Sequence, residues 1–203
     1  IVRRMAALVQ RDGVVHVLDL GCGVGRLEHF LREGQLRMVG MDVSPKELDK
    51  ARIDNPHCTF EVFDGQTIPS HDSRFDLVFA INVFHHVPLG NRQRLLEEMT
   101  RVTRSGGLVA LFEHNPFNPL TRRVVARCEF DRDAILLKPR EVVNRMAQSH
   151  LRDIQTDYFL FLPVYHKVTT WIDQCLRWLP LGAQFCTFGR KMGREAVESD
   201  TRP

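Results

Sequence analysis

The chain has 203 residues, of which 43% are hydrophobic and 26% are charged, and its formal net charge is +3 at pH 7. This length and composition are typical of one globular domain with its own core, and they exclude a disordered or fibrous chain. The mild charge, without a dense Lys/Arg block, argues against a nucleic-acid partner.

Five cysteines are scattered along the chain without a Cys-x-x-Cys pair. This argues against a zinc site or a disulfide framework and predicts a reducing, cytoplasmic setting. No signal-peptide pattern or membrane-length apolar run is evident, so we expect no stable membrane insertion. Because the chain opens at Ile1 rather than methionine, we expect a natural N-terminal segment to precede it.

Apolar and amphipathic segments alternate along the chain, which predicts a layered α/β fold. The expected strands are 14–20, 36–42, 58–63, 75–81, 108–112, 156–164 and 183–190. The expected helices are 2–10, 25–32, 45–54, 91–104, 141–149 and 166–179. Ser44 and Pro45 predict the start of the third helix, and Ser105-Gly106-Gly107 predicts the end of the fourth. We expect one domain over residues 1–192, with 193–203 as a frayed tail.

The stretch from Asp19 to Gly25 reads Asp-x-Gly-x-Gly-x-Gly, between an apolar strand and the start of a helix. Glycine lets the backbone turn sharply and lets a ligand approach its amides. A helix N-terminus behind the loop offers free N–H groups and partial positive charge. A dinucleotide fingerprint beginning at Gly21 would need glycine where Arg26 stands, which disfavours NAD-type cofactors.

With this motif the chain resembles the class I S-adenosylmethionine-dependent methyltransferases, and among them the small-molecule group that includes ubiquinone-biosynthesis enzymes. The resemblance covers about residues 14–191. It implies a Rossmann-like, doubly wound, mostly parallel sheet of seven strands with the last strand antiparallel. It also implies S-adenosylmethionine as cofactor, bound outside the carboxyl ends of the strands.

Acidic residues follow the first three strands. Asp42 ends the second strand, where a carboxylate can accept both ribose hydroxyls; a capping role is the alternative. The resemblance implies that Asp64 and Gly65 contact adenine and that Asp19 lies near the cofactor ammonium. The alternatives are an ordinary Asp-Gly turn and a structural acid that holds the loop. The expected cofactor-binding residues are Asp19, Gly21, Cys22, Gly23, Gly25, Asp42, Val43, Asp64, Gly65, Asn82 and Val83.

Three histidines are candidate catalytic residues: His85 and His86 after the fourth strand, and His114 at the end of the fifth. Displacement at a sulfonium has a neutral leaving group, so the enzyme mainly aligns the reactants. A base assists when the acceptor is a hydroxyl, and histidine suits that role. His85 is favoured as base; the alternative is that His85 and His86 are both structural. No metal is expected, because metal-dependent catechol-type methyltransferases carry a carboxylate where this chain has Asn82.

Residues 115–137 contain two Asn-Pro pairs and follow the fifth strand, where this fold inserts its substrate cover. We expect a lid there, with Arg122 or Arg123 holding a polar or anionic acceptor; a rigid surface connection is the alternative. The Trp-bearing stretch 171–179 predicts core packing, with an apolar acceptor pocket or weak membrane contact as the alternative. The expected function is methyl transfer to a small-molecule oxygen nucleophile. A nucleotide-dependent oxidoreductase and a catalytically silent S-adenosylmethionine-binding module are the alternatives.

Overall fold

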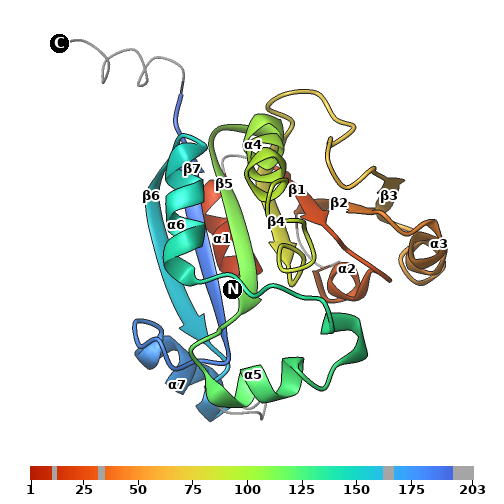
Figure 1. The fold of residues 1–203 in the computed structure, drawn as a ribbon. Coiled ribbons are helices and arrows are strands. Elements are labelled where there is room, and N and C mark those ends of the chain that lie inside the picture. The colour runs from red at the N-terminus through yellow and green to blue at the C-terminus, as the bar shows by residue number, and fades with distance from the viewer. Residues whose placement is uncertain (11–12, 32–34, 162–166, 194–203) are drawn as a thin grey trace.

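The structure is a computed structural model that describes residues 1–10, 13–31, 35–161 and 167–193. Its core is a seven-stranded sheet in the order β3-β2-β1-β4-β5-β7-β6 (Figure 1). The strands are β1 Val15–Leu20, β2 Leu36–Asp42, β3 Thr59–Val62, β4 Phe75–Ile81, β5 Thr103–His114, β6 Leu151–Phe159 and β7 Gln184–Lys191. The helices are α1 Val2–Val9, α2 Arg26–Leu31, α3 Pro45–Asp54, α4 Arg92–Val102, α5 Pro119–Val125, α6 Pro139–Gln148 and α7 Lys167–Leu176, with a short 3-10 helix, η1, at Glu129–Asp131.

The first five strands are parallel, and β7 is antiparallel to both β5 and β6. This confirms the predicted doubly wound sheet with an antiparallel last strand. The order reverses at β1, because β2 and β3 lie on one side of it and β4 and β5 on the other. A ligand crevice in an open α/β sheet forms at such a reversal, outside the carboxyl ends of the strands.

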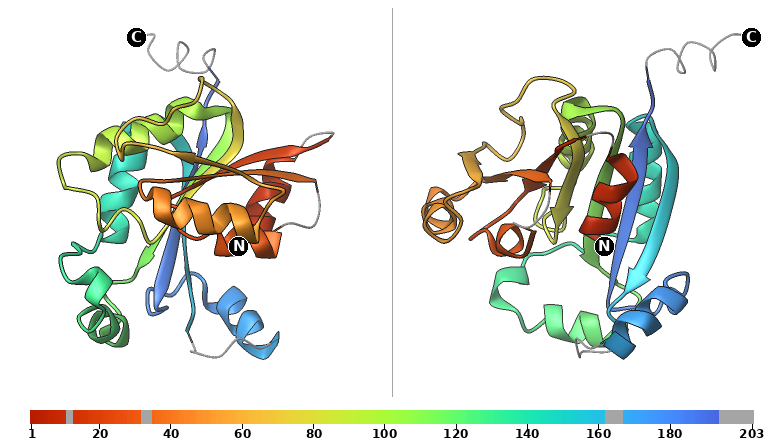
Figure 2. Two further views of the ribbon diagram at one scale, coloured as in Figure 1. Left: turned by 90° about the vertical axis from the view of Figure 1, so that its right-hand side faces the viewer. Right: turned by 180° about the vertical axis from the view of Figure 1, so that it is seen from behind.

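Two apolar layers cover the sheet. On one face, α4 and α6 pack against β1, β4 and β5; on the other, α1 and the end of α2 pack against the same strands. β4 is buried along Phe75–Ala80 on both faces, as its near-continuous apolar run predicts. The right-hand view of Figure 2, from behind, shows α1 in front of the sheet. In that view α5 and α7 lie at the bottom of the molecule and α4 lies at the top.

Two strands begin several residues before the predicted position. β5 begins at Thr103, directly after α4, so Ser105-Gly106-Gly107 lies inside a strand rather than in a helix-ending turn. The strand is irregular there: Thr103 pairs with Phe75 and Leu108 with Leu77, so the extra residues bulge, and Gly106 takes a φ of 77°. The glycines therefore serve a bulge, which local sequence does not distinguish from a helix cap.

β6 covers Leu151–Phe159 and not 156–164, of which 162–164 lie outside the described residues. β6 is the edge strand, and its early residues are mostly exposed and polar. The sequence therefore has no apolar run that would indicate where this strand begins. A bulge between Arg152 and Gln155, with Asp153 at a φ of 51°, further breaks the alternation. The predicted tail beyond Gly193 and residue His166 of the predicted Trp-bearing helix also lie outside the described residues.

Candidate functional site

The glycine loop joins β1 to α2 and is hydrogen bonded to the end of β2. The backbone N–H groups of Gly21 and Cys22 both donate to Met41 O, at 2.6 and 3.1 Å. Gly21 has a φ of 80°, and a Cβ there would overlap the side chain of Val83. Glycine is therefore required at Gly21 both by the backbone conformation and by the close approach of the segment after β4.

Asp42 fixes the loop to the start of α3. Its carboxylate accepts from the N–H of Gly23 through Oδ2 and from the N–H of Ser44 through Oδ1, each at 2.9 Å. Ser44 in turn caps α3 by accepting from Glu47 N, as predicted. Asp42 is half-buried, and each of its carboxylate oxygens can accept a further hydrogen bond.

Two further carboxylates lie beneath the loop. Asp19 and Glu28 are both buried, and neither oxygen of Glu28 has a hydrogen-bond partner among the described residues. Burial raises the pKa of Glu28 to about 7. Burial, reinforced by the charges of Glu28 and Asp42, raises the pKa of Asp19 well above its usual range. Burial therefore favours the neutral form of both carboxyls, and a cation bound at this end of β1 would favour the charged form.

The remaining predicted cofactor residues lie around this edge. Asp64 is exposed after β3, and its Oδ1 accepts from Gln66 N and Thr67 N at 2.8 and 2.7 Å, which lowers its pKa. Asp64 thus builds a turn, which is the alternative to the expected adenine contact. Asn82 follows β4 at a φ of 55°, and its Oδ1 is buried without a partner among the described residues. Cys22 is inert, because burial and the neighbouring carboxylates raise its thiol pKa beyond the physiological range.

The three predicted histidines meet at the carboxyl ends of β4 and β5. The ring centroid of His85 is 4.1 Å from that of His86 and 5.3 Å from that of His114. His85 Nδ1 is 2.6 Å from Glu113 Oε2, and both side chains are only 1% exposed. Glu113 Oε1 also accepts from Phe84 N, which fixes the carboxylate in place. Glu113 therefore orients the His85 ring and leaves Nε2 as its free nitrogen.

Asp131 of η1 approaches the histidines from the segment after β5. Its Oδ1 lies 3.3 Å from His85 Nε2 and 3.4 Å from His86 Nε2, but the angle to His85 is not that of a hydrogen bond. Burial lowers the pKa of His85, but Glu113 and Asp131 outweigh it and the net pKa is raised. Burial and the charge of His85 lower the pKa values of His86 and His114.

Arg92 holds the segment that carries Asp131. The guanidinium is fully buried and donates to Val87 O at 3.0 Å and to Ile135 O at 2.7 Å. Ile135 N donates back to His85 O at 3.0 Å. The predicted lid segment is thus bound at its far end to the histidine-bearing turn. Arg122 and Arg123, the predicted substrate residues, are exposed on α5.

Glu113, Asp131, Glu28 and Arg92 were not among the predicted site residues. Glu113 had a recognisable signal, because it is a charged residue directly after the buried apolar run Leu108–Phe112. Glu28 and Arg92 look like ordinary polar positions of amphipathic helices. Asp131 lies beside the histidines only because the segment after β5 folds back over them, which the local sequence does not show.

His85, His86 and Asp131 could also hold a metal ion, since their ligand atoms lie within 4.8 Å of one another.

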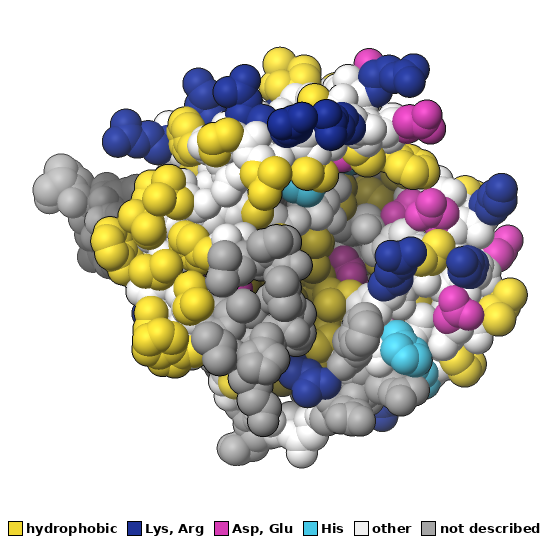
Figure 3. Space-filling model, turned by 90° about the horizontal axis from the view of Figure 1, so that it is seen from below, with side chains coloured by type: hydrophobic (Ala, Val, Ile, Leu, Met, Phe, Trp, Pro, Cys, Tyr) yellow, Lys and Arg dark blue, Asp and Glu magenta, His cyan; other side chains and the backbone are white. Residues whose placement is uncertain are grey.

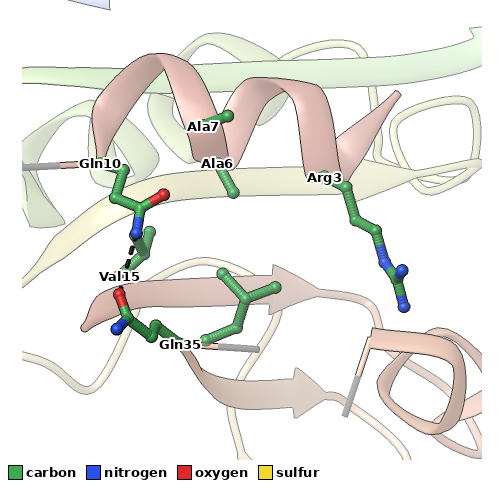
Figure 4. Close-up of a pocket in the computed structure, with 7 residues that line it drawn as sticks. Arg3, Ala6, Ala7, Gln10, Val15 and Gln35 are labelled. Atoms are coloured by element: carbon green, nitrogen blue, oxygen red, sulfur yellow. Dashed lines mark hydrogen bonds between the residues drawn. The ribbon is translucent and has the colours of Figure 1, made fainter. Parts of the chain in front are cut away.

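A pocket of about 140 Å³ lies between α1 and the starts of β1 and β2, where the side chain of Gln10 donates a hydrogen bond to that of Gln35 (Figure 4). Val15 and Leu36 in its lining are the first residues of their strands. The pocket is therefore at the opposite end of the sheet from the histidines and has no part in this site.

Comparison with known proteins finds methyltransferases that match the part of the chain with the glycine loop. Residues 17–107 match the family model of a methyltransferase domain. The chain therefore contains a methyltransferase domain over this range. An uncharacterized methyltransferase of Synechocystis sp. is 34% identical over 103 residues, which are 50% of this chain and 49% of that relative. The 27-O-demethylrifamycin SV methyltransferase of Amycolatopsis mediterranei is 29% identical over 116 residues, covering 53% of this chain and 42% of that relative. The chain thus spans about half the length of the curated relatives it matches.

Solved structures of SAM-dependent methyltransferases have a similar fold over nearly the whole chain. A SAM-dependent methyltransferase from Archaeoglobus fulgidus has a TM-score of 0.71 at 16% identity, covering 94% of this chain and 91% of its own. A SAM-dependent methyltransferase from Thermotoga maritima has a TM-score of 0.70 at 18% identity, covering 93% and 86%. At these identities the likeness concerns the fold.

The loop edge fits the family cofactor, S-adenosylmethionine, which carries an ammonium, a sulfonium and a ribose diol. Asp19 and Glu28 are buried carboxyls that a cofactor cation at this edge would return to their charged forms. Asp42 has lone pairs left for a diol, and the orphaned Asn82 Oδ1 is a further acceptor. No helix in the described part of the chain is long and apolar enough to cross a membrane.

Proposed function

We propose that the chain transfers a methyl group from S-adenosylmethionine to the oxygen of a small-molecule acceptor. Bound at the loop edge, the cofactor supplies an electrophilic methyl on a sulfonium whose thioether leaves as a neutral group. Asp42 holds the ribose, and Asp19 attracts the ammonium. Asp64 and Gly65 hold adenine, and the Asn82–Val83 backbone lies along the methionine end.

The observation that carries the choice of an oxygen acceptor is the Glu113–His85 pair. A hydroxyl must lose its proton as it attacks, and a positioned base supplies that step. Glu113 holds Nδ1 at 2.6 Å, so the neutral imidazole keeps its proton there and Nε2 receives the acceptor proton. The proton leaves the hydroxyl oxygen for His85 Nε2, and the resulting imidazolium is stabilised by Glu113 and Asp131.

The segment 115–137 is the acceptor cover in this proposal. Asp131 sits over both histidines, and Ile135 is bonded to the backbone of His85. Closing this end excludes water from the base and strengthens its interactions. Arg122 and Arg123, exposed on α5, are available to a polar or anionic group of the acceptor. We place this activity in the cytoplasm, where the five unpaired cysteines remain reduced.

A methyl-transfer assay tests the proposal. The chain is incubated with S-adenosylmethionine labelled in the methyl group and a panel of phenols, alcohols and amines. We expect labelled ether products, and a loss of about 10²- to 10⁴-fold in rate for His85→Gln. His57→Gln, an exposed histidine after α3, is the control and keeps the full rate.

Two outcomes count against this function. Cofactor binding without turnover on any acceptor class would identify a catalytically silent module. Full activity of His85→Gln would show that the histidine is structural and that the acceptor needs no base from it.

A further inference from the structure

Six large apolar side chains are exposed at the end of the molecule that carries the site. They come from α5, α7 and the segments beside them, and their exposed fractions lie between 56% and 70%. We call them the apolar rim: Phe117, Leu120, Val124, Trp171, Trp178 and Leu181.

Hydrogen bonds bring the rim segments together. Asn118 Nδ2 donates to Leu181 O at 2.7 Å, and Thr121 Oγ1 donates to Ala183 O at 2.9 Å. Asn115 Nδ2 donates to Pro180 O at 3.1 Å. The start of α5 therefore lies directly against the segment that follows α7, and both helices lie below the sheet in Figure 1.

The rim is not explained by packing within the domain. In α5, Thr121 and Val125 form the buried row, whereas Leu120 and Val124 form a second apolar row at i and i+4 that faces solvent. Figure 3 shows hydrophobic side chains gathered on one side and along the upper part of this face, beside a hollow. Contiguous exposed apolar surface of this kind marks an interaction site.

Basic side chains accompany the rim. Exposed Arg122, Arg123, Arg127 and Arg132 lie on or after α5, and exposed Arg177 precedes Trp178. Figure 3 shows a row of Lys and Arg along one edge of the hollowed face. Tryptophan favours the headgroup level of a bilayer, and each arginine near the surface adds attraction to anionic lipids. A symmetric contact with a second copy would instead bring these arginines near one another.

The geometry points to peripheral docking of this face on an anionic membrane surface, with the apolar rim at the headgroup level. The described residues include no membrane-spanning helix, so the contact is interfacial. Because β4 and β5 end at the same edge, the docked chain receives an amphiphilic acceptor held in the membrane. That second step rests on the proposed function; the docking does not.

The chain offers a direct probe, because its only two tryptophans, Trp171 and Trp178, both belong to the rim. We would titrate the chain with vesicles of phosphatidylcholine alone and of phosphatidylcholine with phosphatidylglycerol. We expect a blue shift of tryptophan emission and co-flotation with the anionic vesicles only, both reduced by added salt.

Variants locate the contact by flotation. Replacing both tryptophans with alanine weakens anionic-vesicle binding about tenfold or more, and Arg122→Gln with Arg123→Gln weakens it about tenfold. Ile53→Ala, at an equally exposed apolar residue on α3, is the matched control and leaves binding unchanged.

Equal binding to neutral vesicles, or no binding to either, overturns the docking. A blue shift that grows with protein concentration without vesicles also overturns it, because a second copy then covers the rim. Calorimetry with S-adenosylhomocysteine on the same samples separates the two proposals. Cofactor binding without vesicle binding refutes the docking alone, and vesicle binding without cofactor binding refutes the proposed function alone.

Discussion

Among single residues, His85 carries the proposed base chemistry, and that role depends on its ionisation. As a base it must be neutral, yet Glu113 and Asp131 raise its pKa above 6.5. The kcat/KM of the chain should therefore rise with pH through a value above that of ordinary histidine. Glu113→Gln removes the hydrogen-bonded charge, so the acid limb of the profile should move to lower pH while the maximal rate falls.

The measurement is kcat/KM across about pH 5 to 9. Asp131→Asn is the comparison variant and should move the limb in the same direction by less, because Asp131 is the smaller cause of the shift. An acid limb that stays in place in Glu113→Gln would mean that another group titrates.

Glu28 predicts a pH-dependent stability. Burial raises its pKa from 4.5 to about 7 in the folded chain, so the proton is bound more tightly in the folded state. Its contribution is complete below pH 4.5 and is lost as the pH rises through about 7. Glu28→Gln should therefore raise the free energy of unfolding at pH 8 by about 2–3 kcal/mol and change it little at pH 4.

Urea unfolding at the two pH values measures this difference. Glu97→Gln, at an exposed residue of α4, is the control and should show no such dependence. Equal effects of Glu28→Gln at both pH values would show that its carboxylate has a partner in solution.

The places of the three histidines and the loop acids at strand ends could be predicted from the sequence, because each follows or ends an apolar run. The sequence did not predict Glu113 and Asp131 as their partners, because pairing depends on which strand ends meet and on how residues 115–137 return to β4.

At the scale of elements, Arg92 joins α4, the turn after β4 and the end of the lid segment. Arg92→Met leaves Val87 O and Ile135 O without their donor in a buried setting, which should cost about 2–4 kcal/mol of unfolding free energy. It should also speed proteolysis within 119–137, because Ile135 loses one of its two anchors.

Chemical unfolding and limited proteolysis of the folded chain measure the two effects. Arg94→Met, an exposed arginine two positions along α4, is the matched control and should change neither. Faster proteolysis elsewhere in the chain, but not in 119–137, would contradict the role of Arg92 as an anchor of the lid segment.

Strands with a largely apolar sequence were predicted best. β2 and β4 have their predicted bounds, since each is a largely apolar run with a clear end. The prediction misplaced β6, because an exposed edge strand with a bulge shows no regular alternation of apolar and polar residues. It began β5 too late, because the glycines of a bulge resemble those of a helix cap.

At the scale of the whole molecule, the cluster of His85, His86 and Asp131 allows a test for metal. The proposed displacement has a neutral leaving group and a histidine base, so it needs no Lewis acid. Treatment with EDTA followed by desalting should leave the methyl-transfer rate unchanged. Loss of activity that added Zn²⁺ restores would make His85 a metal ligand rather than a base.

The domain architecture followed from sequence because the alternation of strands and helices specifies a parallel sheet. The apolar rim did not, since a stretch with two tryptophans is more often core, and only the exposed fractions of Trp171 and Trp178 show that it is surface.

The central claim is that the loop edge of β1 and β2 holds S-adenosylmethionine. Isothermal titration with S-adenosylhomocysteine and, separately, with NADH and NADPH tests it most directly, with Asp42→Ala as the paired variant. We expect saturable binding of S-adenosylhomocysteine, strongly weakened in Asp42→Ala, and no binding of either dinucleotide. Binding of NADH or NADPH, or no binding of S-adenosylhomocysteine to the unaltered chain, would contradict it.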